Sequence, residues 1–363
     1  MSTFDVHRLP MTDPGDVSSL DAAIVSGEID PAEIIGIISQ PEGTGHARAL
    51  TMLQLALLIG RHLDQPADDV IARVPMMMIG LCGGLMSPHH NVITRSDSGD
   101  VTPTGEPRLA VGVASTRDIE PSELGTALQA QLVAEAVAEA VSDGGMTIDD
   151  VTCVQIKCPA MTPERAKSVA KLPGGSLGAA SSASKAASAL GIAIGLGEVD
   201  IEAVTDDVIN SDRSLFTERG SVSAGGEQTA CRILVFGNST SSTSALVSGC
   251  GVMTDQLDVS GVMDALTNAG LDAPSSPLAP EDVARVRQVF INCGADLTSE
   301  VRNRRHTINS DFLSGYAGIV AKAVANAVVA SVVGDPMVLA SAGAEHQGPP
   351  GSNLITVLLE ANT

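Results

Sequence analysis

Aromatic residues are nearly absent from this chain of 363 residues, which has no tryptophan, one tyrosine and five phenylalanines. Its hydrophobic fraction of 44% is ordinary and therefore has to come from aliphatic side chains. We expect aliphatic cores. We do not expect a binding site that stacks its ligand between aromatic rings.

Positive charge is also scarce, because 21 Lys and Arg stand against 43 Asp and Glu, for a net charge of −22. Phosphate backbones are bound by basic patches, and none is visible, so we predict no nucleic-acid partner. The acidity favours solubility, or else a salt-adapted host. Any cation that does line a functional site therefore carries more weight than usual.

The six cysteines form no CxxC or Cys/His metal spacing. Residues 1–16 are polar, and no run is long and apolar enough to cross a bilayer. We therefore expect a cytoplasmic protein with reduced thiols and no membrane partner.

Three segments repeat one pattern without a gap: residues 48–60, 185–197 and 322–334. Each opens on a cation (Arg48, Lys185 or Lys322), continues as an apolar stretch rich in small and aliphatic residues, and closes on glycine. Three copies of a helical pattern predict three similar domains around a pseudo-threefold axis. The three cations would then converge on one central ligand.

The same order of elements surrounds each repeat. An apolar strand comes first, then the helix headed by the cation, then a small-residue turn with an adjacent strand. The expected first strands are 33–39, 151–156 and 286–291. The expected turns are 79–83, 223–227 and 341–345. The strands expected beside those turns are 74–78, 232–236 and 337–340. This alternation predicts an α/β fold of three domains, 1–103, 110–247 and 253–363.

Connecting segments are expected where turn residues gather. Residues 97–107 and 249–258 are expected linkers, and the proline-rich stretch 273–280 is an expected loop before a helix starting at Pro280. A long helix is expected over 118–144.

The second domain holds the best catalytic pair. Lys157 ends an apolar strand, and Ser223 stands in a glycine-rich turn. A serine hydroxyl becomes a good nucleophile when a base removes its proton, and a lysine can do so only when neutral. We expect the charge of Lys185 to help lower the pKa of Lys157.

Several motifs then point to a known family. They are Val-Gln-Ile-Lys-Cys-Pro at 154–159, Ser-Pro-His-His at 87–90, Arg-His-Thr at 305–307, Ala-Glu-His-Gln-Gly-Pro-Pro-Gly at 344–351, and the opening stretches 4–10 and 14–16. Over essentially its whole length the chain resembles the cyanuric acid hydrolase/barbiturase family. The resemblance implies three similar domains with a central active site, hydrolysis of a cyclic amide by three Ser–Lys pairs and three arginines, and a homo-oligomer, commonly a tetramer.

Carried over by position, the resemblance makes Lys157 the base and Ser223 the nucleophile. In the third domain the serine is Ser341, but the lysine position is Asn292. In the first domain the serine position is Ile79 and the lysine position is Gln40. The expected substrate-binding residues are Arg48, Ile79, Gly80, Lys185, Ala224, Lys322, Ser341 and Ala342.

These departures affect the expected substrate. Three equivalent sets of serine, lysine and arginine suit a ring with threefold symmetry such as cyanuric acid. Here Ile79 presents an apolar side chain in place of a hydroxyl. Lys185 and Lys322 each present a compact point charge in place of the planar, two-pronged guanidinium of an arginine. We therefore expect a less symmetric cyclic amide or imide. Two alternatives remain open: a catalytically degenerate binding protein, and another reaction on the same scaffold, such as lactone hydrolysis or proton transfer.

The resemblance implies no cofactor for catalysis but a structural Mg2+ or Ca2+ near the C-terminus. The matching positions are Ala344, Gln347, Gly348 and Pro349. The family's glutamate ligand falls on Gly294, with Asp296 as a possible substitute, and Ser352 replaces a glycine.

Other polar residues have plainer expectations. We expect His89, His90 and His346 to make structural hydrogen bonds, and Cys82 to be a spectator thiol. Glu227 and Glu345 each follow a turn serine by four residues, so either orients a cation or simply starts a helix.

Overall fold

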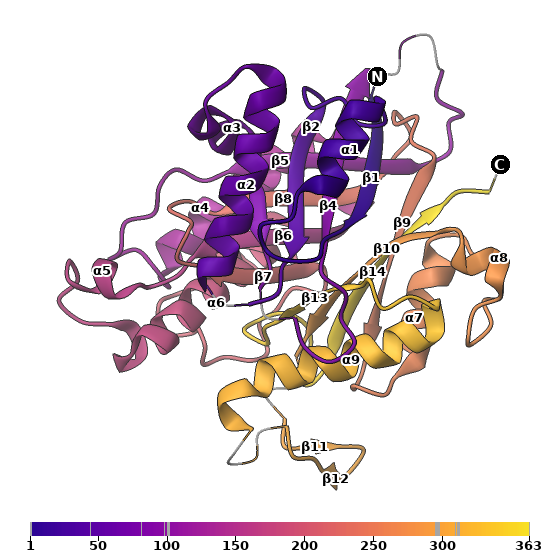
Figure 1. Ribbon diagram of the computed structural model, residues 1–363. Coiled ribbons are helices and arrows are strands. Elements are labelled where there is room, and N and C mark those ends of the chain that lie inside the picture. The colour runs from indigo at the N-terminus through magenta and orange to yellow at the C-terminus, as the bar shows by residue number, and fades with distance from the viewer. Residues whose placement is uncertain are drawn as a thin grey trace.

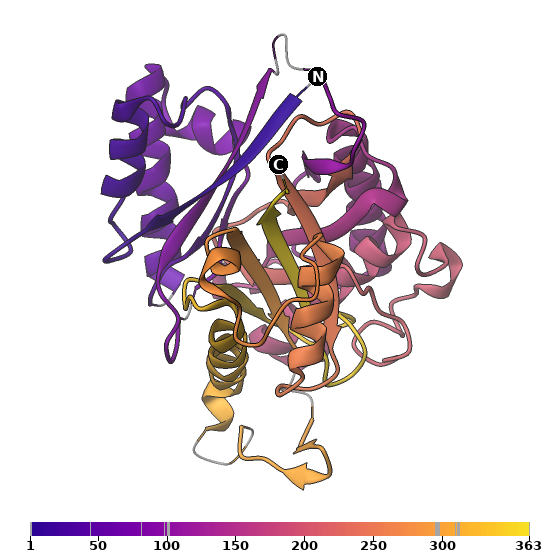
Figure 2. The same cartoon turned by 90° about the vertical axis from the view of Figure 1, so that its right-hand side faces the viewer.

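The computed structural model describes residues 2–362 except 44, 81, 98, 100–101, 295–297, 309 and 311–312. Three four-stranded sheets have the same strand order: β1-β4-β2-β3, β5-β8-β6-β7 and β9-β14-β10-β13. In each sheet the last two strands run parallel and the other neighbours antiparallel. Figures 1 and 2 show the three sheets packed around a common centre with their helices outside.

The first sheet consists of β1 (Ser2–Pro10), β2 (Ile34–Gln40), β3 (Met76–Met78) and β4 (His89–Asp97), with α1 (Ser18–Ser26), α2 (Gly45–Leu63) and α3 (Ala67–Arg73). The second consists of β5 (Arg108–Ser115), β6 (Val151–Pro159), β7 (Gly220–Gly225) and β8 (Arg232–Ser239), with α4 (Ala127–Asp143), α5 (Pro163–Ala166) and α6 (Leu177–Gly195). The short helices η1 (Ile148–Asp150), η2 (Pro173–Gly175) and η3 (Ile201–Ala203) connect its elements.

The third sheet consists of β9 (Leu246–Met253), β10 (Val286–Cys293), β13 (Leu339–Ala342) and β14 (Asn353–Glu360), with α7 (Val259–Asn268), α8 (Pro280–Val283) and α9 (Ala317–Val333). The small hairpin of β11 (Glu300–Val301) and β12 (Arg304–Arg305), followed by η5 (Ser314–Tyr316), lies between β10 and α9. This hairpin projects from the body at the bottom of Figure 1.

The expected α/β fold with three similar domains is confirmed. The three predicted apolar strands form as β2, β6 and β10, but they do not come first in their domains, because β1, β5 and β9 precede them in the same sheets. The cores are aliphatic, since the buried clusters consist mostly of Ile, Val, Leu, Ala and Met. Only one close aromatic pair occurs in the described structure, Phe236 with Phe290, whose ring centroids lie 5.2 Å apart.

The repeat helices differ from expectation at their starts. Each begins before its cation, so Lys185 lies nine residues into α6 and Lys322 six residues into α9. In α6 the reason is a serine cap, since the hydroxyl of Ser176 accepts the amide of Ala179 at 3.1 Å. Lys185 and Lys322 therefore stand on the flanks of their helices, whereas Arg48, the fourth residue of α2, stays in the first turn.

Other boundaries also needed correction. The helix expected from residue 118 begins at Ala127, where Thr126 caps it after Gly125 at φ +76°. The first half of the expected linker 249–258 belongs to β9, which pairs with β14. The third sheet therefore starts at Leu246. Ser223 and Ser341 lie within β7 and β13, in the C-terminal halves of these strands, and not in turns.

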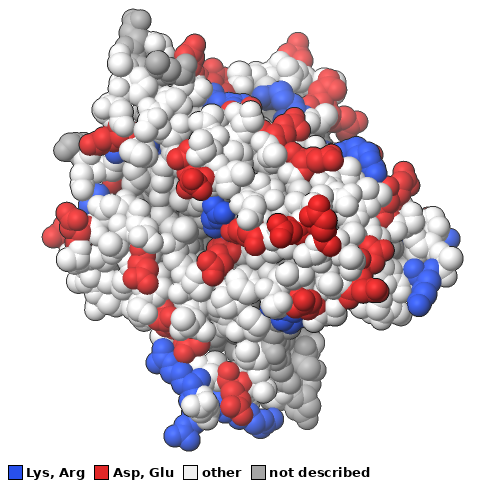
Figure 3. Space-filling view, turned by 180° about the vertical axis from the view of Figure 1, so that it is seen from behind, with Lys and Arg blue, Asp and Glu red and all other residues white. Residues whose placement is uncertain are grey.

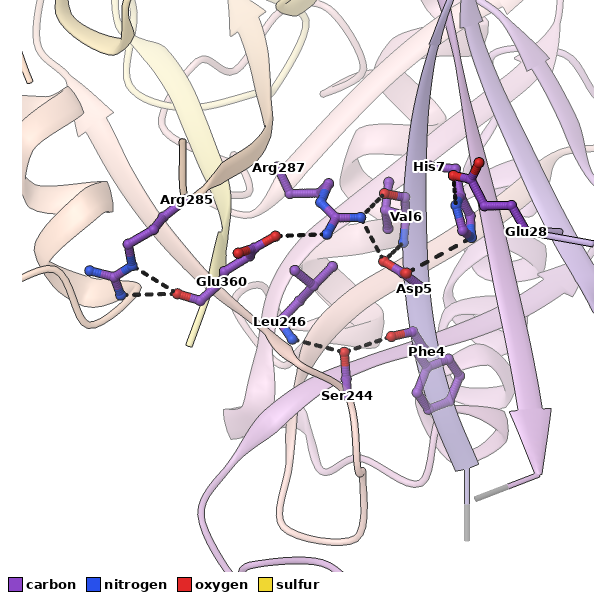
Figure 4. Close-up of polar contacts among 10 residues, drawn as sticks. All are labelled: Phe4, Asp5, Val6, His7, Glu28, Ser244, Leu246, Arg285, Arg287 and Glu360. Carbon is purple, nitrogen blue, oxygen red and sulfur yellow. Dashed lines mark hydrogen bonds and ion pairs between the residues drawn. The ribbon is translucent and has the colours of Figure 1, made fainter. Parts of the chain in front are cut away.

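Polar contacts tie the first and third domains together (Figure 4). The guanidinium of Arg287 donates to Asp5 at 3.0 Å and, through its other nitrogen, to Glu360 at 2.9 Å. The hydroxyl of Ser244 donates to the carbonyl of Phe4 at 2.6 Å. These contacts join β1 to the third sheet, and they help to hold the three domains as one body.

Acidic side chains are spread widely over the face in Figure 3, as the net charge requires. None of the described helices is long and apolar enough to cross a membrane.

Candidate active site

The parallel strand pairs of the three sheets end at one central cavity of about 480 Å³. All ten residues predicted to act on or bind the substrate line it. They are Arg48, Ile79, Gly80, Lys157, Lys185, Ser223, Ala224, Lys322, Ser341 and Ala342. The tertiary structure thus brings together residues that are up to 294 positions apart in the sequence.

Strand register explains why equivalent positions meet. Lys157 lies directly opposite Ser223 in the parallel pair β6–β7, and Asn292 lies opposite Ser341 in β10–β13. In the first sheet the pairing ends at Ser39 opposite Met78, and Gln40 and Ile79 follow. The positions matched by resemblance are therefore equivalent in space as well.

The second domain holds the only complete Lys–Ser pair among these three sets. The ammonium of Lys157 donates to the hydroxyl of Ser223 at 3.2 Å and lies 3.7 Å from a carboxylate oxygen of Glu227. Lys157 is 1% exposed. Burial lowers its pKa to about 8, Glu227 acts in the opposite direction, and Arg48 lowers it further.

Lys185, which was expected to help lower the pKa of Lys157, is not among the main causes of this shift. Lys185 lies 2.7 Å from Glu345, which compensates its charge. The largest cationic contributions to the lowered pKa of Lys157 come from Arg48 and, more weakly, Lys322. Cations from the two other domains therefore contribute to this shift.

Glu227 and Glu345 orient cations, which decides between the two alternatives left open by the sequence. Glu227 lies 3.5 Å from the guanidinium of Arg48, and Glu345 accepts from Ser182 at 2.7 Å in addition to pairing with Lys185. The pKa of Glu345 is lowered despite the opposing effect of its burial, because Lys185 and Ser182 stabilise the carboxylate. Each carboxylate thus reaches the cation of the preceding domain.

Gly80 provides the surface on which Arg48 lies. A Cβ atom at Gly80 would come within 3.1 Å of the guanidinium and 3.2 Å of two side-chain carbons of Arg48. The carbonyl of Gly80 accepts from the ammonium of Lys322 at 2.9 Å. One residue of the first domain therefore positions two of the three cations.

In the first domain Gln40, at the position equivalent to Lys157, forms a structural bridge. The amide of Gln40 donates to the carbonyl of Ile79 at 2.7 Å and accepts from the backbone of Ala340 at 2.9 Å. In the third domain Asn292 donates to the carbonyl of Gly343 at 2.8 Å. Its carbonyl oxygen and the hydroxyl of Ser341 are buried without a hydrogen-bond partner in the described structure.

Sequence reasoning missed the part of the wall formed by Ser182, Tyr316 and Ile319. Ser182 and Ile319 stand three residues before Lys185 and Lys322, hence on the same helix faces. Helical periodicity counted back from each cation could have found these two. Tyr316 has no such signal, because it precedes α9.

The three histidines make structural hydrogen bonds, as expected. His90 contacts the hydroxyl of Ser39 at 2.8 Å, and His89 contacts the carbonyl of Ser87 at the same distance. His346 contacts the carbonyl of Leu215 at 2.6 Å. Burial raises the pKa of Cys82 to about 11, as expected of a spectator thiol.

Most of the oxygens expected to hold a metal already accept hydrogen bonds from other groups of the protein. The carbonyl of Ala344 accepts from Arg213 at 3.2 Å, and that of Pro349 accepts from the amide and hydroxyl of Ser352 at 3.0 and 2.7 Å. The side-chain oxygen of Gln347 accepts from the amide of Val222 at 2.6 Å. Hard cations prefer free oxygens with a carboxylate, so this donor set fits one poorly. Asp296 lies outside the described residues, and the metal stays a prediction.

The fold and the cavity define a three-domain protein with a serine–lysine pair at its pseudo-threefold centre. The family model described as "Amidohydrolase ring-opening protein" matches residues 5–360. This chain belongs to that family of ring-opening amidohydrolases, which confirms the resemblance noted in the sequence.

Individual relatives agree with the assignment. A cyclic amide hydrolase from Azorhizobium caulinodans is 40% identical over 98% of this chain and 99% of its own length. A cyanuric acid amidohydrolase from Pseudomonas sp. (strain ADP) is 36% identical over 99% of this chain and 100% of its own. A solved cyanuric acid hydrolase structure superposes with a TM-score of 0.93 at 36% identity, covering 99% of this chain and 100% of that one. These names agree with the expected enzyme class, an amidohydrolase of cyclic amides.

Proposed function

We propose that this protein hydrolyses a carbon–nitrogen bond of a cyclic amide or imide, with Ser223 as the nucleophile and Lys157 as the base. One observation carries the proposal: the amine of a buried lysine lies 3.2 Å from a serine hydroxyl in a central cavity. A pKa lowered to about 8 makes the neutral, basic form of Lys157 accessible near physiological pH.

The reaction follows from these positions. Neutral Lys157 removes the proton of Ser223 as the hydroxyl oxygen attacks a ring carbonyl carbon. The resulting lysinium returns a proton to the leaving nitrogen, so the ring opens and an acyl-serine remains. Water then attacks the acyl carbon and gives a proton to Lys157, which passes it to the Ser223 oxygen as the acyl–oxygen bond breaks, so that both residues return to their starting state.

The cations of the cavity support the charged stages. Negative charge develops on the carbonyl oxygen during attack, and Arg48, Lys185 and Lys322 all line the same cavity. Ala224 and Ala342 follow the two serines on their strands and line it too. We propose that their backbone holds oxygens of the ring.

We further propose a substrate less symmetric than cyanuric acid. Only the second domain has both lysine and serine, the third keeps the serine, and the first presents Ile79 in place of a hydroxyl. A ring with three equivalent carbonyls would bring one polar group against that apolar wall. The broader name of the 40% identical relative, cyclic amide hydrolase, is compatible with this view.

Turnover assays on barbituric acid, cyanuric acid and less symmetric cyclic imides test the proposal. We expect ring opening of at least one ring other than cyanuric acid. Efficient cleavage of cyanuric acid would contradict the substrate proposal.

A Ser223 adduct seen by mass spectrometry supports acyl transfer. Binding without turnover or adduct would favour the degenerate binding protein, and turnover without an adduct would favour proton transfer. The cytoplasmic location and the homo-oligomer remain predictions.

A further inference from the structure

The carboxylate–cation pairs of the cavity follow the pseudo-threefold symmetry, except at one position. Glu227, four residues after Ser223, pairs with Arg48 of the first domain. Glu345, four residues after Ser341, pairs with Lys185 of the second. By the same rule, Lys322 of the third domain should pair with a carboxylate four residues after Ile79. That residue is Gly83.

A carboxylate at this position has no room. A Cβ atom built on Gly83 would lie 2.5 Å from the Cγ2 atom of Ile319. Ile319 occupies the position on α9 that Ser182 occupies on α6, three residues before the cation. Ser182 donates to its carboxylate, whereas Ile319 fills the space where one would stand. The two substitutions together remove the third ion pair.

Lys322 is therefore left with a neutral partner. It is 4% exposed, its ammonium donates to the carbonyl of Gly80, and it lies within 4.0 Å of no carboxylate in the described part of the chain. The titratable and charged groups that act on it are Cys293 of β10, Cys82 of the first domain and Arg48 of α2. An ammonium has three N–H donors, and the carbonyl of Gly80 uses one of them.

The charges of the cavity do not cancel as a result. Arg48 is balanced by Glu227 and Lys185 by Glu345. Lys157 also lies 3.7 Å from Glu227 and is neutral in the state that acts as a base. In that state one positive charge without a carboxylate beside it remains, at Lys322. A buried charge without a counter-ion is costly, so an anionic ligand group beside it binds favourably.

We propose that the cavity takes its ring as an anion, with the ionised imide edge against Lys322 and an un-ionised amide carbonyl at Ser223. This inference rests on the proposed function and narrows its substrate to acidic rings, in which an N–H or C–H group lies between two carbonyls. The arrangement solves a chemical difficulty, because serine attacks a neutral amide carbonyl more readily than one that shares the negative charge.

Binding of two rings of similar size tests the proposal. Barbituric acid is ionised at neutral pH and dihydrouracil is not. Titration calorimetry at pH 7 on the Ser223→Ala chain measures binding without consuming either ring. We expect barbituric acid to bind at least about tenfold more tightly, and we expect Lys322→Met in that background to remove most of this preference. Lys167→Met, which removes an exposed lysine paired with Glu164, is the matched control and should leave the preference unchanged.

A second variant keeps the lysine and restores the missing partner. In Gly83→Glu/Ile319→Ser the new carboxylate should pair with Lys322 and lower the preference for the anion, as Lys322→Met does. Equal binding of both rings to the parent chain would overturn the proposal, and so would a preference that survives both variants. If the anion binds through Lys322 but no ring is opened, the charge preference stands and the proposed hydrolysis fails. If neutral and acidic rings are opened equally well, the hydrolysis stands and this inference fails.

Discussion

Lys157 and Ser223 face each other across the parallel strands β6 and β7, with the amine 3.2 Å from the hydroxyl. Because both stand on strands of one sheet, their separation depends on backbone hydrogen bonding and not on loop conformation. The equivalent register in the third sheet places Asn292 opposite Ser341. The three domains thus share one geometry but differ in the chemistry they present.

Replacement of the nucleophile gives the most direct prediction. Ser223→Ala should lower kcat for ring opening by at least about a thousandfold, since no acyl intermediate can form. Its melting temperature should change little. Ser341→Ala is the matched control, because this serine stands opposite Asn292 and has no lysine to activate it. Similar losses in both variants would contradict the assignment of the nucleophile.

The pH dependence of the reaction reports on Lys157. Only neutral Lys157 accepts a proton, so kcat/KM should rise with pH and level off above about pH 8. Glu227 acts to raise this pKa. Glu227→Gln should therefore move the rising limb to lower pH, whereas Glu164→Gln, at an exposed position, should leave it in place. A limb that moves to higher pH would show that Glu227 does not act on the base.

Stability should respond to pH through Lys322. Burial lowers its pKa from 10.5 to about 8, so the unfolded chain binds more protons between those values and the native protein becomes more stable as pH rises through them. Below pH 8, removing the buried charge in Lys322→Met should raise the free energy of unfolding by about 1–3 kcal/mol. Loss of the hydrogen bond to the carbonyl of Gly80 reduces this gain. This advantage should shrink between pH 8 and 10.5. Urea unfolding at pH 7 and 10 measures it, and an unchanged advantage would contradict the lowered pKa.

Gln40 should be structural, although it occupies the position in the first sheet that Lys157 occupies in the second. Gln40→Leu leaves two buried backbone groups, the carbonyl of Ile79 and the amide of Ala340, without their partner. We expect a loss of about 2–5 kcal/mol in the free energy of unfolding. Gln65→Leu, at an exposed position, should cost less than about 1 kcal/mol. An equally small effect of both would mean that the bridge contributes little.

The C-terminal turn offers a test of the metal. Arg213 already occupies the carbonyl of Ala344, so a chelator should leave the melting temperature unchanged, while Arg213→Met should lower it. Arg61→Met, which removes a largely exposed arginine paired with Asp21, is the control. A fall in melting temperature on chelation, with a stoichiometric divalent ion found by elemental analysis, would show that the turn holds a metal after all.

Much of this protein could be predicted from its sequence. Three cation-bearing helical repeats and three apolar strands predicted the three-domain α/β fold, because burial patterns and repeats are properties of local sequence. All ten residues expected at the centre line the cavity. The boundaries were less accurate: Ser176 and Thr126 cap helices at positions that hydrophobic periodicity does not mark.

Partnerships between charges could not be predicted, because they join different domains. Lys185 was expected to act on Lys157 within its own domain, yet it pairs with Glu345 of the next. Pairing of Arg48 with Glu227 spans 179 residues. The sequence by itself determined which residues reach the centre, through the repeated order of strand, helix and strand. Only the tertiary structure decided which carboxylate compensates which cation, because that depends on the packing of three domains around one axis. The same packing leaves Lys322 without a carboxylate in the described structure, where Ile319 fills the space beside Gly83.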